Sequence, residues 1–168
     1  MGLRILVDGY NFIGFSGGLT GDLKGERDRL IGQLAEYQKI RGIPVCVIFD
    51  AWKEGLLSQH VEHRNGVEII FSRLGETADQ VIIRLIRKLG EQCVVVSGDR
   101  EIVQVAARSG STSVSPREFR LKLDEASRTD LVEEETEEGR LPDGNRKRGN
   151  PNRLSKKERM KRSKLKKL

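Results

Sequence analysis

The chain has 168 residues, of which 36% are apolar and 33% are charged, and 31 basic against 25 acidic side chains give a net charge of +6. Its apolar runs are far shorter than the roughly 20 residues that cross a bilayer, and its first residues lack the features of a signal peptide. Cys46 and Cys93 each lie inside an apolar run. We therefore expect two buried thiols in a reducing compartment, not a disulfide framework or a zinc site, and a cytoplasmic protein.

The charge is distributed unevenly along the chain. Residues 140–168 carry 13 basic and two acidic side chains, whereas residues 1–139 carry 18 basic and 23 acidic ones. An acidic body is thus followed by a strongly basic C-terminal segment. We predict a folded domain at 1–127, an acidic linker at 128–145, and a basic tail at 146–168 that is flexible or becomes helical on binding RNA.

Short runs of apolar and β-branched residues predict strands that are buried on both faces. They lie at residues 3–7, 44–49, 67–71, 93–97 and 112–114. Helices are predicted between them, because apolar residues recur at intervals of three and four or because a helix start signal is present. They lie at residues 23–41, 78–89, about 102–107 and 116–126. This alternation predicts an α/β fold with a mainly parallel sheet.

Carboxylates follow several of the predicted strands. Asp8, Asp50 and Asp99 each come directly after a strand, and Asp79 lies in the first turn of a helix that Thr77 caps. In a parallel sheet, strand ends and the starts of the following helices meet at the same edge, so these four side chains are placed to converge.

Converging carboxylates repel one another unless a cation neutralises them, and sites with oxygen ligands alone suit Mg²⁺ or Mn²⁺. A bound divalent ion would favour hydrolysis of phosphodiester bonds. The alternative for each residue taken alone is that the aspartate caps a turn or a helix.

Four blocks of the sequence carry a resemblance to a known family. They are residues 6–14 (LVDGYNFIG), 47–51 (VIFDA), 76–80 (ETADQ) and 95–101 (VVSGDRE). In this order they resemble the YacP-like family within the NYN branch of PIN-like nucleases, over about residues 3–125. The resemblance implies a three-layer PIN-like sandwich, a divalent metal and ribonuclease activity. Characterised relatives include ribosome-associated endoribonucleases that cut mRNA.

The resemblance also assigns roles to residues. Asp8, Asp79 and Asp99 match the core acidic positions, and Asn11 matches an asparagine that contacts the substrate or a metal-bound water. Asp50 matches a further acidic position. Glu101 is the candidate for an additional acid, pointing either at the metal or at solvent.

Other residues are candidates for contacts with RNA. Tyr10 would stack on bases or anchor a loop, and Arg73 and Arg100 would bind phosphate or form surface ion pairs. The Gly-rich segment 14–21 lacks a P-loop pattern and is interpreted as a flexible loop or a flap that contacts phosphate. In the tail, the basic candidates are Arg146, Lys147, Arg148, Lys156, Lys157, Arg159, Lys161 and Arg162.

The sequence therefore predicts a metal-dependent endoribonuclease that uses Mg²⁺ or Mn²⁺ and acts on RNA, with mRNA and the ribosome as expected partners. The alternative is a non-catalytic RNA- or ribosome-binding module of the same fold, in which the carboxylates cap helices and no metal is needed.

Overall fold

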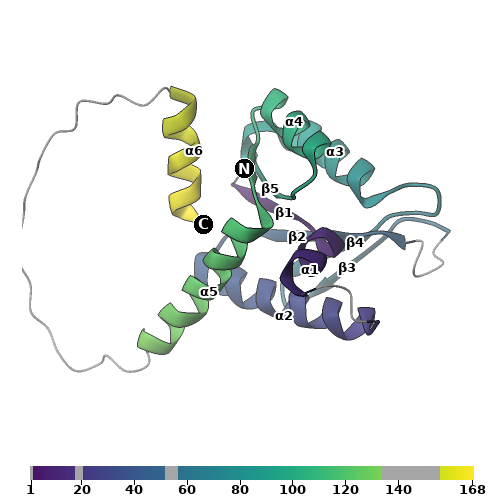
Figure 1. Ribbon diagram of the computed structural model, residues 1–168, viewed down its shortest axis with the longest axis horizontal. Helices are drawn as coiled ribbons and strands as arrows, with labels where there is room; N and C mark the ends of the chain where they lie inside the picture. The colour runs from purple at the N-terminus through teal and green to yellow at the C-terminus, as the bar shows by residue number, and fades with distance from the viewer. Residues whose placement is uncertain (1, 18–20, 52–56, 134–155) are drawn as a thin grey trace, which may run out of the picture.

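The structure is a computed structural model that describes residues 2–17, 21–51, 57–133 and 156–168. Its centre is a six-stranded sheet between two layers of helices (Figure 1). The strands are β1 (Arg4–Asp8), β2 (Val45–Phe49), β3 (His60–Arg64), β4 (Val67–Phe71), β5 (Cys93–Val96) and β6 (Thr112–Val114). The helices are α1 (Gly9–Gly17), α2 (Leu23–Arg41), α3 (Ala78–Leu89), α4 (Arg100–Arg108), α5 (Pro116–Glu133) and α6 (Lys156–Lys167), with a 3₁₀ turn at Gly90–Gln92.

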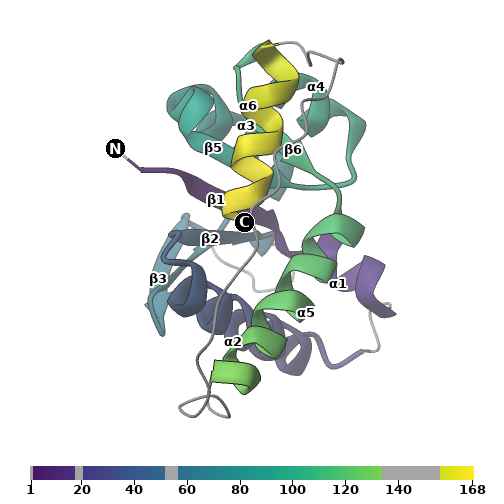
Figure 2. The same cartoon turned by 90° about the vertical axis from the view of Figure 1, so that its left-hand side faces the viewer.

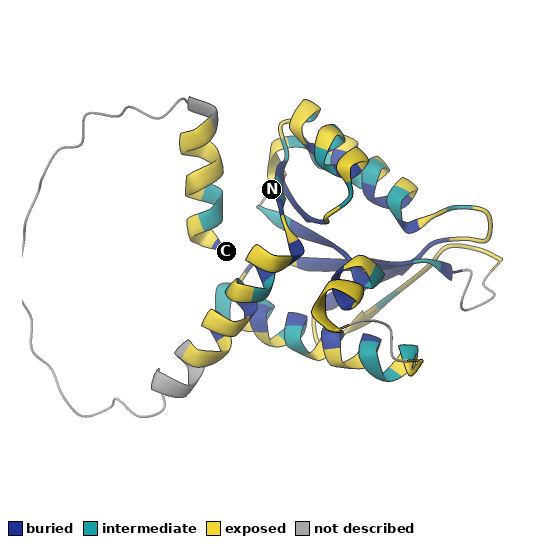
Figure 3. Ribbon diagram, in the orientation of Figure 1, coloured by how far each residue is buried: buried dark blue, intermediate teal, exposed yellow. Residues whose placement is uncertain are grey.

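The strand order is β3-β4-β2-β1-β5-β6, and all neighbours pair in parallel except β3 and β4. Every residue of β2 and β5 is buried, as continuous apolar strands of a parallel sheet require. Figure 3 shows this buried sheet between helices whose outer faces are exposed. The predicted three-layer α/β sandwich is confirmed, and so are all five predicted strands.

Each face of the sheet has its own apolar core. One core joins the sheet to α1, α2 and α5 through residues such as Phe12, Leu34 and Phe119. The other joins it to α3 and α4 through residues such as Ile82 and Ile102. Both cysteines are buried and free, as predicted, and burial raises the pKa of each thiol.

The site is positioned by β1. This strand lies between β2 and β5, and its last residue, Asp8, pairs with Ile48 of β2. After β1 the chain forms β2, which pairs with one edge of β1, and it later returns to form β5, which pairs with the opposite edge of β1. The carboxyl end of β1 is therefore the switch point at which open α/β sheets form their binding crevices.

Two elements were absent from the sequence prediction. The antiparallel strand β3 pairs with β4 through a two-residue turn in which Asn65 and Gly66 both have positive φ, 51° and 87°. Helix α1 includes Gly14 to Gly17, so that half of the predicted Gly-rich loop is helical, whereas residues 18–20 lie outside the described chain. Four glycines in or beside α1 favour a loop prediction, so the helix that buries Phe12 and Ile13 was not predicted.

Helix α6 packs against the body, which differs from the flexible tail that the composition predicts. Leu168 is fully buried in the core shared with α2 and α5, and Leu165 packs against the same core. The Tyr37 hydroxyl donates a hydrogen bond to the Leu168 carbonyl oxygen, and Lys164 donates to the Glu91 carbonyl oxygen. The sequence did not predict that these two leucines anchor the helix, because the segment is strongly basic and the residues they contact are distant in sequence.

These contacts place α6 beyond the amino-terminal ends of the strands (Figures 1 and 2). Glu91 lies just before β5, and Tyr37 lies in the last turns of α2, just before β2. Asp8 lies at the opposite end of β1. None of the helices in the described part of the chain is long and apolar enough to span a membrane.

Candidate active site

Asp8 is the most deeply placed acid of the site. Its residue is only 6% exposed. One carboxylate oxygen accepts from the backbone N–H of Asn11 at 3.4 Å, and the other accepts from the Ser97 hydroxyl at 3.4 Å. Burial, together with the charges of Asp79 and Asp50, raises the pKa of Asp8 from 3.8 to about 7, although the two hydrogen bonds act in the opposite direction.

Asp79 lies in the first turn of α3. Thr77 and Gln80 form a reciprocal capping box that fixes this helix start, as predicted from the sequence. Partial burial raises the pKa of Asp79, and the charges of Asp99, Asp50 and Glu101 add to the effect. The side chain of Asp79 accepts no hydrogen bond from the described residues.

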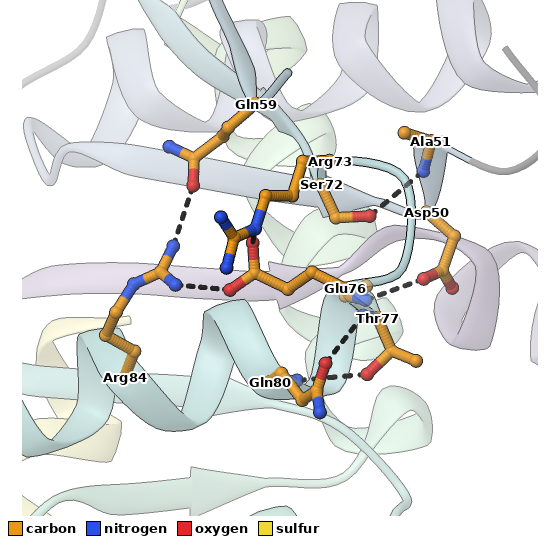
Figure 4. A network of polar contacts seen from close by, with 10 residues as sticks. Asp50, Ala51, Gln59, Ser72, Arg73, Glu76, Thr77, Gln80 and Arg84 are labelled. Carbon is orange, nitrogen blue, oxygen red and sulfur yellow. Dashed lines mark hydrogen bonds and ion pairs between the residues drawn. The ribbon is translucent and has the colours of Figure 1, made fainter. Parts of the chain in front are cut away.

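Asp50 connects the end of β2 to the same helix start. One of its carboxylate oxygens accepts from the Ala78 N–H at 2.6 Å, as Figure 4 shows. Ser72, which is fully buried after β4, accepts a hydrogen bond from the Ala51 N–H at 3.0 Å. The loop that leads into α3 is thereby fixed to the end of β2, and Asp79 is fixed with it.

Asp99 is the N-cap of α4, and one of its oxygens accepts from the N–H groups of Glu101 at 2.7 Å and Ile102 at 3.4 Å. The Asn11 side-chain oxygen accepts from the Gly98 N–H at 3.1 Å and so ties α1 to the loop before α4. Glu101 is exposed in the first turn of α4. The structure thus shows Asp99 capping a helix, which is one of the roles that the sequence left open.

The five acids share one region, since Asp79 and Asp50 raise the pKa of Asp8, and Asp99, Asp50 and Glu101 raise that of Asp79. Carboxylates of this kind are hard oxygen ligands, which fits a divalent cation better than a soft metal. Within the described ranges, no three acidic, histidine or cysteine side chains stand close enough together to hold an ion. The donor chemistry therefore fits a metal, and the side chains would have to draw together around it.

Gly9 explains how α1 can begin directly after Asp8. A Cβ atom at this position would lie 2.3 Å from Cε1 of Phe49, which no real contact allows. Only glycine lets the chain turn from β1 into α1 so close to β2. The Asp-Gly pair in the first sequence block therefore reflects a packing requirement as well as chemistry.

Sequence reasoning missed Ser97. It is 2% exposed, its hydroxyl donates to Asp8, and the same oxygen accepts from the Asp99 N–H at 3.1 Å. Ser97 therefore links two of the core acids. The available signal was a hydroxyl residue at the end of an apolar strand, directly before Gly98.

The three candidate RNA contacts outside the tail, Tyr10, Arg73 and Arg100, differ in how far they are buried and in what they contact. Tyr10 is half-buried; its ring meets Phe49 edge-on with centroids 5.1 Å apart, and its hydroxyl accepts from Arg27 at 3.1 Å. This is the anchoring arrangement left as an alternative to stacking on bases. Arg73 is exposed and pairs with Glu76 at 3.6 Å, and Arg100 is exposed at the start of α4.

The candidate RNA contacts of the tail are only partly described. Arg159, Lys161 and Arg162 are exposed on α6. Lys156 and Lys157 belong to the helix backbone, and their side chains lie outside the described set. Arg146, Lys147 and Arg148 lie wholly outside the described residues.

Known proteins resemble this chain in sequence and in fold. Uncharacterized protein YacP of Bacillus subtilis is 45% identical over 91 residues, which make up 51% of this chain and 52% of that protein. The match thus spans about half the length of that relative. A crystal structure of a mutant of Rae1 (YacP) from B. subtilis superposes with a TM-score of 0.65 at 28% identity, covering 80% of this chain and 86% of that chain. A second crystal structure of Rae1 (YacP) gives a TM-score of 0.62 at 30% identity, covering 80% of each chain.

The family assignment rests on nearly the whole chain. The model of the YacP-like NYN domain family matches residues 5–167, and so extends through α6, well beyond the residues 3–125 that the sequence blocks cover. The acids described above lie within the four blocks that carried the resemblance. The chain belongs to the YacP-like NYN domain family, whose domains are typically nuclease-like.

Proposed function

We propose that this protein is a divalent-metal-dependent endoribonuclease that hydrolyses phosphodiester bonds of RNA, with cytoplasmic mRNA on the ribosome as its substrate. The observation that carries the proposal is the gathering of carboxylates at the carboxyl ends of β1, β2 and β5 and at the start of α3. Membership of a nuclease-type family supports it.

Asp8, Asp79 and Asp99 would hold Mg²⁺ or Mn²⁺, with Asp50 and Glu101 beside them. When bound, such an ion activates water and stabilises the charge that develops on the phosphodiester. Asp79 is the most available ligand, because its side chain takes part in no hydrogen bond with the described residues. Removing its charge therefore changes the site without removing a helix cap.

The surrounding residues position these acids. The Ser97 hydroxyl donates to the Asp8 carboxylate and accepts from the Asp99 N–H, so it fixes these two residues relative to each other. The Asn11 side chain ties α1 to Gly98. Both contacts reduce the movement needed to gather the carboxylates around a charge. In this proposal Asn11 acts first as a positioning residue, and its exposure leaves it free to meet substrate.

RNA must be attracted to a site that repels it when no cation is present. The exposed basic residues of α6 supply an attractive surface, on which Arg159, Lys161 and Arg162 would contact phosphates. For single strands, log K is expected to fall with log salt by about 0.7 per neutralised phosphate.

A second candidate function is a non-catalytic RNA- or ribosome-binding module. Two contacts favour it: Asp99 caps α4, and Asp50 accepts from the first residue of α3. Under this alternative the carboxylates stabilise helix starts, and the protein binds RNA equally well with or without a divalent ion.

The test is cleavage of RNA by the purified protein with Mn²⁺, with EDTA, and with the substitution Asp79→Asn. Asp124→Asn is the matched control, because it removes an exposed acid of α5 away from the site. We expect Mn²⁺-dependent cleavage that Asp79→Asn abolishes and Asp124→Asn leaves intact. The assay is repeated with translating ribosomes, so that a requirement for the ribosome is detected.

Cleavage that persists unchanged in Asp79→Asn would refute this assignment of the site. Metal-independent RNA binding without cleavage, on free RNA and on ribosomes alike, would favour the binding module.

A further inference from the structure

A groove runs along the outer surface of α3, next to the acidic site. It has a volume of about 630 Å³ and is lined by Gln80, Ile83, Arg84 and Arg87 of α3, by Glu101 of α4, and by residues of the loop before α3. The α3 residues recur at intervals of three and four, so they form one face of the helix. This face begins one residue after Asp79.

The groove reaches one of the acids of the site, Glu101. Glu101 lines it and also raises the pKa of Asp79 through its charge. At the other end of α3, the 3₁₀ turn contains Glu91, whose carbonyl oxygen accepts from Lys164 of α6. With 12 residues in α3, this path is about 18 Å long at 1.5 Å per residue.

Three arginines supply the positive charge of the groove. Arg84 donates hydrogen bonds to Glu76 and, at 2.7 Å, to Gln59, and Arg73 faces the same Glu76 carboxylate at 3.6 Å (Figure 4). Glu76 is only 10% exposed at its side chain, so it is held between the two guanidinium groups. Arg87 is exposed and pairs with no residue in the described part of the chain.

We propose that this groove binds the phosphate backbone of single-stranded RNA and guides it along α3 between the basic helix α6 and the acidic site. The inference rests on the proposed function. Arg87 and Arg84 contact successive phosphates, since a guanidinium presents several donors to a phosphate. Contacts of this kind are independent of base sequence. The groove thereby connects two surfaces that lie at opposite ends of the strands.

Glu76 has a specific place in this proposal. In the free protein its carboxylate occupies the guanidinium groups of Arg73 and Arg84, and a phosphate of RNA competes with it for them. Removing the charge of Glu76 therefore tightens RNA binding, whereas a purely structural network would lose stability without gaining affinity.

The experiment measures the affinity for a fluorescent single-stranded RNA by anisotropy, with every variant built on Asp8→Asn so that no cleavage occurs. We expect Arg87→Glu to raise Kd about tenfold, the effect of one lost charge-assisted contact, and to reduce the salt slope by about 0.7 per phosphate. Lys88→Glu is the matched control: it makes the same charge change at an exposed position of α3 that does not line the groove. We expect Glu76→Gln to lower Kd, and the thermal stability of each variant shows that it is folded.

Equal effects of Arg87→Glu and Lys88→Glu would overturn the proposal, because they would show a general charge effect. An unchanged Kd in Arg87→Glu, or a weaker affinity in a folded Glu76→Gln, would overturn it as well. Cleavage by the wild-type protein is measured in parallel. If only Arg87→Glu weakens binding and the wild type cuts no RNA, the groove stands and the proposed nuclease activity fails.

Discussion

Asp8→Asn should stabilise the metal-free protein while it removes a core acid of the site. Asp8 is 6% exposed, and burial beside Asp79 and Asp50 raises its pKa from 3.8 to about 7. An acid whose pKa is raised by folding contributes nothing to stability while it is protonated in both states, and it destabilises the native state once it ionises. Ionised Asp8 therefore destabilises the fold, and an uncharged side chain of the same shape removes that effect.

The magnitude follows from the shift in pKa. A change from 3.8 to about 7 corresponds to about 4 kcal/mol of unfolding free energy once Asp8 is fully ionised. Asparagine keeps an oxygen for the Asn11 N–H and loses the bond with the Ser97 hydroxyl, which costs about 1 kcal/mol. The net gain at pH 8 is about 3 kcal/mol, or about 6–12 °C in Tm for a chain of this size.

The pH dependence distinguishes this effect from better packing. Below pH 3.8 both the folded and the unfolded wild type hold the Asp8 proton, so the charge contributes nothing. Between pH 3.8 and about 7, each pH unit lowers the stability of the wild type by about 1.4 kcal/mol relative to Asp8→Asn, and above that range the difference is constant. The advantage of the variant therefore grows as the pH rises from 4 to 7.

The assay is urea unfolding in EDTA at pH 5 and pH 8. Asp124→Asn is the control, and its stability should stay within about 0.5 kcal/mol of the wild type, since it changes an exposed side chain. The reasoning is refuted if Asp8→Asn is no more stable than the wild type at pH 8, or if its advantage is the same at both pH values.

Three further predictions concern the metal, the start of α1 and the end of α6. Mn²⁺ should raise the stability of the wild type by about 2.7 kcal/mol at a concentration of 100 Kd and leave Asp8→Asn unchanged, as measured by thermal unfolding. Gly9→Ala should lower the unfolding free energy by about 1–3 kcal/mol in urea, because its Cβ would overlap the Phe49 ring. Leu168→Ala should release α6, so that trypsin cleaves within α6 faster than in the wild type while cleavage within α2 is unchanged.

The sequence predicted the parts of the site that depend on local pattern. Asp8, Asp50 and Asp99 follow short apolar runs, and strands of this composition place such residues at one edge of a parallel sheet. The capping-box pattern of Thr77 and Gln80 predicted the start of α3, and the structure contains this capping box. In each case the information lies within a few residues, so no knowledge of distant contacts was needed.

The missed parts depend on residues that are far apart or on signals that were overlooked. The Asn-Gly pair at 65–66 is a strong hairpin signal, and it precedes the β4 strand that was predicted. Ser97 gained its role only when β5 was placed beside β1, which brings its hydroxyl to Asp8. Leu168 looked like part of a solvated tail, because its partner Tyr37 is 131 residues away in sequence.

The position of α6 bears on the charge balance of the acidic site. Leu168 and Lys164 anchor the basic helix near the amino-terminal ends of the strands, whereas the acids lie at the carboxyl ends, and the five residues of β1 alone span about 16 Å between these ends. This length is about twice the Debye length at physiological ionic strength, so charges at one end of the strands are largely screened from the acids at the other end. Among the described side chains, no ion pair joins the lysines and arginines of α6 to the acids of the site. The chain is basic as a whole, yet burial and the neighbouring acids Asp79 and Asp50 still raise the pKa of Asp8, and we propose that a divalent ion relieves this repulsion.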